Sequence, residues 1–378
     1  MHARLSEQDQ YFLERITRFV DEEVIPAADA LDAEGTYPHD LVKRLKELDF
    51  FGASGRALPT YCLALEELAR GWLSLIPVVN AHTSSVWTIR NYGTDAQKYR
   101  WLERLKTGQW TACLGLTEPH GGSDLQNVSS TARRVNDGWV IDAHKTFITH
   151  SEHSDAMMIL LRTAQRSPGV PGLSLFMVQR EEWEVVRALP KLGTKAVETC
   201  EVRISDLRVP QDRLIGDVPG HGFGQVMDAL EVGRLAVAAA AVGVGRSALW
   251  NAVDYVKQRE AFGKLVGDQP AVHAQLAEVG NALAASKALT LAAATAKQSG
   301  GRRDLETSSA KVFASDTAVR AALVAMELAG GNGYLEDHRF ARILRDATLF
   351  LAGEGSNGVL NALIGNKIRQ GRKDLSWI

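Results

Sequence analysis

The sequence lacks a surplus of charge of either sign, a cysteine pattern and any long hydrophobic run. Its 43 Lys and Arg residues nearly balance 45 Asp and Glu residues, for a formal net charge of −2, so no broad basic field is available to hold a nucleic-acid backbone. Its three cysteines, Cys62, Cys113 and Cys200, lie far apart, which predicts neither a disulfide framework nor a zinc site. No segment approaches the ~18 apolar residues of a membrane span, and the N-terminal stretch has no signal-peptide pattern. We therefore predict a soluble, cytoplasmic protein that binds no metal and for which neither nucleic acid nor a membrane is a partner.

The spacing of apolar residues changes along the 378-residue chain and predicts separate lobes. Over residues 1–110 the spacing is helical, as at Phe12 and Ile16, and favours a helical first lobe. Over residues 111–215 short alternating stretches flank the turn signal Asn136-Asp137-Gly138, which predicts a β-hairpin within a small β lobe.

The helical pattern returns over residues 216–378 and includes the Ala-rich runs 277–298 and 307–329. Alanine has the highest helix propensity and lets neighbouring helices approach closely. The last lobe is therefore predicted to be a bundle of long helices, and the chain as a whole an α+β fold in the order helices, strands, helices.

Two polar stretches lie within the predicted β lobe. In CLGLTEPHGGSDLQN the backbone N–H groups and the hydroxyls of Thr117 and Ser123 are suited to holding a polar cofactor, although a Gly-Gly-Ser-Asp run is also typical of a plain turn. In HKTFITHS, Phe147 is either a ligand-facing or a core aromatic residue. No strand-turn-helix GxGxxG follows, which excludes a Rossmann dinucleotide site.

Three further stretches lie in the helical last lobe. KQREAFGKL carries Arg259 and Phe262, which suit a pyrophosphate and an adenine face or merely a solvated helix end. ELAGGNGY reads as a helix C-cap or a ligand loop. LAGEGSNG places one acid, Glu354, between two glycines, which indicates either a surface turn or a carboxylate facing a ligand that the glycines let approach.

Taken together, TEPHGGSD, FIT at 147–149, REAFGK, AGGNGY, RDA at 345–347 and EGSN at 354–357 resemble the acyl-CoA dehydrogenase family in order and spacing. The resemblance covers nearly the whole chain. It implies an N-terminal helical domain over 1–110, a β-barrel-like middle domain over 111–215 and a C-terminal four-helix bundle over 216–378. It further implies a homotetramer or homodimer that holds FAD, desaturates an acyl thioester between its α and β carbons and passes electrons to an electron-transfer flavoprotein.

The resemblance also implies roles for particular residues. The general base is expected at Glu354, because the other position used by some family members is occupied here by Gly233. Acyl-thioester contacts are expected at Ser123, Glu231, Arg234 and Gly355. Contacts to the flavin of the same subunit are expected at Leu114, Leu116, Thr117, Gly122, Ser123, Phe147, Thr149, Ser356 and Asn357. Contacts to the FAD of a second subunit are expected at Arg259, Phe262, Gln269, Glu327, Gly330 and Gly331.

Departures from the family pattern leave the substrate and acceptor open. Ile76 stands where an arginine would hold a second carboxylate, so a dicarboxylate substrate is disfavoured. Ala352 and Gly353 replace larger residues before the base, which favours a branched or bulky acyl group. The alternatives are an acyl-carrier-protein dehydrogenase, an acyl-CoA oxidase on the same fold, or a non-catalytic scaffold.

Overall fold

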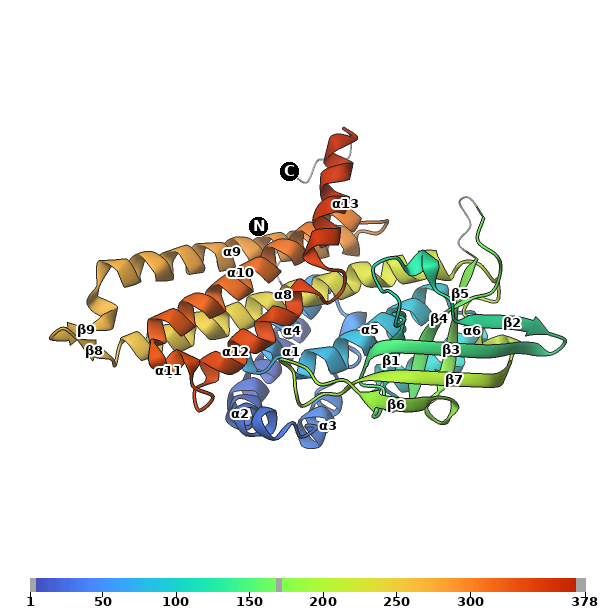
Figure 1. Cartoon of the computed structure of the whole chain (residues 1–378), viewed down its shortest axis with the longest axis horizontal. Coiled ribbons are helices and arrows are strands. Elements are labelled where there is room, and N and C mark those ends of the chain that lie inside the picture. Colours follow the sequence, from blue (N-terminus) through green and yellow to red (C-terminus); the bar gives the residue numbers. More distant parts are fainter. Residues whose placement is uncertain (1–4, 168–171, 372–378) are drawn as a thin grey trace.

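Helices, strands and helices follow one another along the chain in the computed structural model, which describes residues 5–167 and 172–371 (Figure 1). The α+β order predicted from the sequence is therefore confirmed. Among the described residues no helix is long and apolar enough to cross a membrane. Each cysteine is buried and none forms a disulfide within the described ranges.

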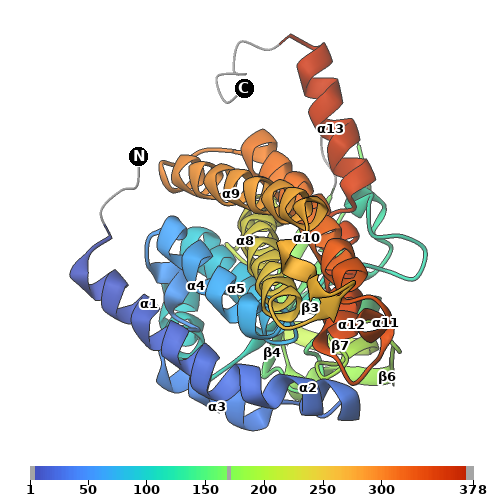
Figure 2. The ribbon, with the colours of Figure 1, turned by 90° about the vertical axis from the view of Figure 1, so that its left-hand side faces the viewer.

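Most of the first helices lie on one side of the long C-terminal helices (Figure 2). On the first of them Phe12, Ile16 and Phe19 are buried along one face, as their spacing predicts. Its start is capped by Ser6, whose hydroxyl oxygen accepts from the backbone N–H of Asp9 at 3.1 Å. The helices are α1 (Glu7–Phe19), α2 (Ile25–Glu34), α3 (His39–Glu47), α4 (Leu58–Gly71), α5 (Leu75–Tyr92), α6 (Asp95–Gln97) and α7 (Glu103–Lys106).

The middle of the chain forms one curled seven-stranded sheet in the order β1-β4-β2-β3-β7-β6, with β5 paired to β4. The predicted hairpin is confirmed, because β2 and β3 pair antiparallel from Val135 opposite Gly138. The pairing of β3 with β7 shifts register between Lys145 and Ile148, so the strand bulges there. The strands are β1 (Ala112–Gly115), β2 (Thr131–Val135), β3 (Gly138–Thr149), β4 (Ala156–Arg162), β5 (Leu173–Gln179), β6 (Glu184–Ala188) and β7 (Thr199–Pro210).

The long helix α8 runs between the first helices and the other C-terminal helices (Figure 2). Most of its residues are buried, and its many small side chains permit close helix crossings. At Gly243 a Cβ atom would lie only 2.1 Å from the backbone oxygen of Glu66 on α4, so only glycine fits this crossing. The C-terminal elements are α8 (Gly222–Val256), β8 (Glu260–Ala261), β9 (Lys264–Leu265), α9 (Pro270–Gln298), α10 (Asp304–Ala329), α11 (Gly331–Tyr334), α12 (Arg339–Ala347) and α13 (Asn357–Arg369).

Candidate active site

Glu354 is half-buried, and its carboxylate lies between α5 and α8. Glu354 lies in the turn between α12 and α13, where its φ of 55° is unusual for a residue with a side chain. Its Oε1 accepts a hydrogen bond of 2.8 Å from Nδ2 of Asn80 on α5. Its Oε2 is buried and has no hydrogen-bond partner among the described residues. The carboxylate rests against α8 at Gly233, where a Cβ atom would lie 2.5 Å from Oε2.

Burial and two nearby cations act on this carboxylate in opposite directions. Burial raises the pKa of Glu354 above its usual value, and Arg234, Asn80 and Lys311 partly offset that rise. Arg234 is itself buried on α8, with Nη1 3.3 Å from the hydroxyl of Ser308. A buried carboxyl group with a raised pKa is a stronger base toward a carbon acid than an exposed one.

Lys311 on α10 holds the backbone of the turn that carries Glu354. Its Nζ donates to the backbone oxygen of Gly355 at 2.8 Å and to Oδ1 of Asn357 at 2.7 Å. Burial lowers the pKa of Lys311 to about 8. The side-chain N–H of Asn357 donates in turn to Asp316 at 2.8 Å. Two of the residues expected at the flavin and substrate are therefore tied to α10 in this structure.

The RDA motif at 345–347 joins α12 to both other lobes. Nη2 of Arg345 lies 2.9 Å from Oδ2 of Asp32 on α2. Oδ1 of Asp346 accepts the backbone N–H of Thr194 at 2.7 Å, in the loop before β7. Gly193 allows this approach, because a Cβ atom there would lie 2.7 Å from the backbone of Arg345. The motif thus fixes α12, and with it the turn at Glu354, relative to the first helices and the sheet.

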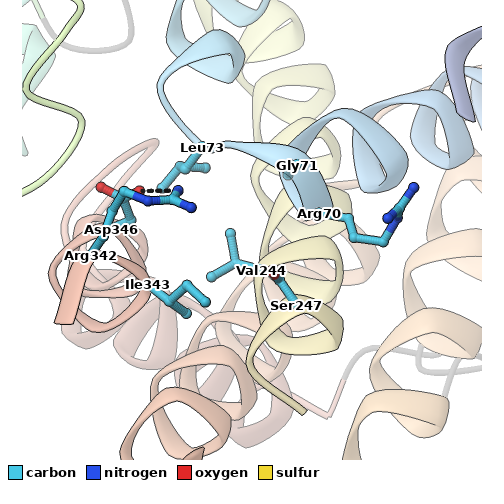
Figure 3. Close-up of a pocket in the computed structure, with 9 residues that line it drawn as sticks. Arg70, Gly71, Leu73, Val244, Ser247, Arg342, Ile343 and Asp346 are labelled. Atoms are coloured by element: carbon cyan, nitrogen blue, oxygen red, sulfur yellow. Dashed lines mark ion pairs between the residues drawn. The ribbon is translucent and has the colours of Figure 1, made fainter. Parts of the chain in front are cut away.

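Asp346 also borders a small cavity between α4, α8 and α12 (Figure 3). The cavity has a volume of about 10 Å³, enough for one water molecule. Arg342 and Asp346 point toward one another beside it, with Nη1 and Oδ2 3.9 Å apart. Burial raises the pKa of Asp346 to about 7. A cavity of this size is too small for a substrate. Asp346 is therefore part of the packing between α4, α8 and α12 and not of a substrate site.

The loop that begins at Thr117 folds back on itself and lies beside the bulge in β3. A Cβ atom at Gly122 would lie 2.8 Å from Cγ2 of Thr117. The backbone oxygen of Thr117 accepts the N–H of Thr146 at 2.9 Å, next to Phe147. Phe147 has a φ of 57°, and the residue is 66% exposed. The structure therefore brings together the glycine loop and the FIT stretch, with an aromatic ring turned out of the sheet.

A buried ion pair anchors this loop to β3. Nζ of Lys145 donates to Oε1 of Glu118 at 2.8 Å, and both side chains are almost fully buried. The other acceptor positions of Glu118 are filled by the backbone N–H groups of Ser129 and Ser130, at 2.7 and 2.9 Å. Despite burial, these contacts lower the pKa of Glu118 to about 2, while burial lowers the pKa of Lys145 to about 8.

The remaining predicted flavin contacts near the loop have varied surroundings. Thr149 shares a hydroxyl contact of 3.1 Å with Thr199 on β7. Leu116 is buried, Leu114 and Ser356 are half-buried, and Ser123 is exposed. These residues stay candidates for flavin contact.

The residues predicted to contact a second subunit's FAD lie away from the Thr117 loop. They flank β8 and β9, at the left-hand end of the molecule, and the end of α10, whereas the sheet lies at the right-hand end (Figure 1). The intervening helix α8 has 35 residues and spans about 50 Å. Phe262 is 98% exposed with a φ of 55°. The other members of this set are Arg259, Gln269, Glu327, Gly330 and Gly331. One chain therefore does not bring the two sets together.

Glu231, expected near the substrate, is fully buried in an ion-pair cluster. Its carboxylate accepts from Nζ of Lys297 at 2.6 Å, from the backbone N–H of Arg303 at 2.9 Å and from Arg302. Lys297 also binds Asp228 at 2.6 Å. Both oxygens of Glu231 thus have internal partners, and its predicted contact with substrate stays a prediction.

Comparison with known proteins supplies the context for this geometry. Family models for the acyl-CoA dehydrogenase N-terminal, middle and C-terminal domains match residues 6–109, 113–207 and 220–368 in turn. An acyl-CoA dehydrogenase of Bacillus subtilis (strain 168) is 32% identical over 369 residues, covering 94% of this chain and 97% of its own. This chain belongs to the acyl-CoA dehydrogenase family.

Solved structures agree with this membership in the family. A glutaryl-coenzyme A dehydrogenase in complex with glutaryl-CoA superposes with a TM-score of 0.93 at 30% identity, covering 99% of this chain and 98% of the other. A prolyl acyl carrier protein oxidase superposes with a TM-score of 0.90 at 26% identity, covering 97% of this chain and 100% of the other. Because the acyl-CoA dehydrogenase family comprises FAD-dependent oxidoreductases, this chain is one as well.

The residues of this acyl-CoA dehydrogenase family member fit FAD. The exposed Phe147 ring is held in a strained left-handed conformation at a bulge, which is typical of a residue that faces a ligand. The adjoining glycine loop offers backbone N–H groups and hydroxyls, the donors suited to a polar cofactor.

Sequence reasoning missed four residues around the two halves of the site. They are Asn80 and Lys311 beside Glu354, and Glu118 and Lys145 beneath the glycine loop. A signal existed for Asn80, because a polar amide ends the apolar run Leu75 to Val79 on a helix and needs a partner when buried. The partners of the other three residues are set only by the tertiary fold.

Proposed function

We propose that this protein is an FAD-dependent acyl-CoA dehydrogenase that introduces a double bond between the α and β carbons of an acyl thioester. The observation that carries the proposal is the carboxylate of Glu354, which lies between α5 and α8 and has one oxygen without a partner among the described residues. A turn on the surface would leave such an acid solvated. A non-catalytic scaffold has no use for a desolvated base.

In the proposed reaction the carboxylate of Glu354 takes the α proton, and the electron pair of that C–H bond forms the new double bond as the β hydride leaves. Bound FAD would supply the two-electron acceptor for that hydride. The backbone N–H of Glu354 forms no hydrogen bond within the described residues and is a suitable donor to the thioester oxygen. Burial raises the pKa of Glu354, and Arg234 and Lys311 lower it, which favours the ionised form that acts as a base.

The acyl group is proposed to be branched or bulky and to carry no second carboxylate. Among the described residues, a Cβ atom at Gly353 would approach only the backbone oxygen of Leu349, at 3.5 Å, so this side of the turn has room. Ile76 is buried and apolar and offers no charge to a distal carboxylate. Both residues lie near the proposed base, because Gly353 precedes Glu354 and Ile76 is on α5, the helix that contacts Glu354.

Anaerobic bleaching of the yellow holoenzyme tests this function. The substrates compared are butyryl-CoA, octanoyl-CoA, isovaleryl-CoA, glutaryl-CoA and one acyl group on a carrier protein. We expect rapid bleaching by a CoA thioester, with isovaleryl-CoA faster than the straight chains and glutaryl-CoA slowest. Bleaching by the carrier-bound acyl group alone would favour the carrier-protein dehydrogenase, and no bleaching by any thioester would overturn the proposal.

The electron acceptor is proposed to be an electron-transfer flavoprotein. One solved neighbour, at 28% identity and a TM-score of 0.93, is described as the electron transferring flavoprotein of Acidaminococcus fermentans. We expect the reduced enzyme to pass electrons to such a protein faster than to oxygen. Faster reoxidation by air in a stopped-flow comparison would instead favour an oxidase.

The assembly is proposed to be a homotetramer, or a homodimer, in which each FAD contacts two subunits. The support is that Phe262 is 98% exposed and Tyr334 is 83% exposed, at the end of the molecule remote from the sheet. We expect Phe262→Asp to lower both the oligomeric state in sedimentation and the FAD content. A tetramer with full FAD in this variant would contradict the shared site.

A further inference from the structure

Asn80 is the direct polar contact of the Glu354 carboxylate in the described part of the chain. It lies on α5, is 8% exposed and donates from Nδ2 to Oε1 at 2.8 Å. We propose that Asn80 is a positioning residue that holds Oε1 of Glu354 and so fixes the direction of the carboxylate that accepts the substrate proton. The inference rests on the proposed role of Glu354 as the base, and it adds a residue 274 positions away in the chain.

The backbone of Glu354 is held separately from its side chain. Lys311 fixes the turn through the backbone oxygen of Gly355, at 2.8 Å. A glutamate side chain still rotates about three bonds, so a fixed backbone does not by itself aim the carboxylate. Asn80 supplies the missing restraint from a helix whose position is set independently, and Ser84 donates to the backbone oxygen of Asn80 at 3.2 Å one turn further on.

The orientation of the Asn80 amide follows from the chemistry of its partner. An ionised carboxylate only accepts hydrogen bonds, so the NH₂ group of Asn80 must face Oε1. Oδ1 of Asn80 then has no partner within the described residues, as Oε2 of Glu354 has none. Asn80 therefore leaves its Oδ1 without a hydrogen bond among these residues while its Nδ2 binds Glu354. A buried polar atom left unpaired calls for an explanation, and the bond to Glu354 supplies one.

The charged groups around Glu354 do not replace this contact. Arg234 on α8 is engaged with Ser308, and Lys311 on α10 with Gly355. Neither forms an ion pair of 4 Å or less with Glu354 in the described residues, although both lower its pKa from a greater distance. Tyr61 on α4 has its pKa raised by burial and donates to Thr83 at 2.8 Å, so it is neutral and directed elsewhere.

Removing the Asn80 donor has a predictable sign. A hydrogen bond to the ionised form lowers the pKa of Glu354, so its loss raises that pKa. Hydrogen bonds to charged groups are strong enough to move a pKa by about 1 unit. Activity requires ionised Glu354, so the acid limb of kcat/KM moves to higher pH. A carboxylate whose direction is not fixed also lowers the plateau of kcat/KM at high pH, by up to about 10²-fold.

The test compares Asn80→Leu and Asn80→Asp, both similar in size to Asn, with Ser84→Ala as the matched control on the same helix. The ionisation of Glu354 is followed in the holoenzyme by infrared difference spectroscopy, as the carboxyl band that disappears in Glu354→Gln. The acid limb of kcat/KM is recorded with isovaleryl-CoA and butyryl-CoA. We expect the midpoint to rise by about 1 pH unit in Asn80→Leu and further in Asn80→Asp, where a second carboxylate faces the first. Ser84→Ala should keep the wild-type midpoint.

A merely structural Asn80 would change melting temperature or FAD content and leave the infrared midpoint of Glu354 where it is. That result in both substitutions, or in Asn80→Asp alone if Asn80→Leu does not fold, would overturn the inference. The infrared measurement needs no turnover. An infrared shift together with full activity in Glu354→Gln would therefore overturn the proposed function while keeping the Asn80–Glu354 contact.

Discussion

Gly233 and Glu354 lie in direct contact, although they belong to α8 and to the turn after α12. A Cβ atom on Gly233 would lie 2.5 Å from Oε2 and 2.7 Å from Cδ of Glu354. Gly233, at the position where some family members carry the base, thus packs against the side chain of the proposed base, Glu354. Because Gly233 has no side chain, the Glu354 carboxylate can occupy its position against α8.

Gly233→Ala is therefore expected to displace the carboxylate of Glu354 while keeping the fold. The atoms displaced are the end of a flexible side chain, and alanine is favoured over glycine in a helix by up to about 1 kcal/mol. We expect a melting temperature equal to or above that of the wild type and flavin reduction slowed by about 10²-fold.

The matched control is Gly224→Ala on the same helix, where an added Cβ would meet no atom within 4 Å among the described residues. This control should gain stability and keep the wild-type rate of flavin reduction. Equal rates in the two variants would show that the contact with Glu354 does not matter.

Asp346 is expected to make stability fall as pH rises. Its pKa in the folded protein is about 7, because burial outweighs Arg342 and the hydrogen bond from Thr194. The folded state then holds a proton that the unfolded state has released, so the stabilisation is fully present below pH ~4 and is lost as pH rises through about 7. The shift corresponds to up to about 4 kcal/mol in free energy of unfolding.

Urea unfolding of Asp346→Asn and the wild type between pH 4 and 8 measures this effect. The variant keeps an acceptor for Thr194 and removes the titration, so we expect its stability advantage over the wild type to grow with pH. The exposed Asp337→Asn should show no such trend. A difference between Asp346→Asn and the wild type that does not depend on pH would rule out the assigned pKa direction.

The buried pair of Glu118 and Lys145 is expected to stabilise the glycine loop only as a pair. Lys145→Met leaves the Glu118 carboxylate buried without its cation, and breaking such a pair costs about 3–5 kcal/mol. The double variant Glu118→Gln with Lys145→Met removes both charges and should recover most of that loss. Denaturant unfolding of the two single variants and the double variant checks this, and additive losses would contradict it.

Regular elements were predictable because their signals are local. The helical spacing of Phe12, Ile16 and Phe19 and the hairpin turn at Asn136 to Gly138 require no knowledge of distant residues. The position of Glu354 relative to the RDA motif came from the family resemblance. The partner of Asn80 could not be found in this way, because Glu354 is 274 residues away and no local pattern links an amide on α5 to a turn after α12.

The same limit explains the other surprises in the site. Lys311 reads as one charge within an Ala-rich helix, and only the packing of α10 against the turn makes it a donor to Gly355. The family resemblance implies a substrate contact at Glu231, whereas the fold surrounds it with Lys297 and Arg302. In each case the sequence indicates the residue type, and the pairing depends on tertiary contacts.

The central claim is that Glu354 is the base, and anaerobic stopped-flow reduction of the flavin by acyl-CoA tests it most directly. Glu354→Gln should retain FAD and bind the thioester, since the amide matches the carboxyl group in shape. We predict that its rate of flavin reduction falls by at least the ~10²–10⁴-fold that a positioned general base contributes. Flavin reduction at a rate near that of the wild type would contradict the account.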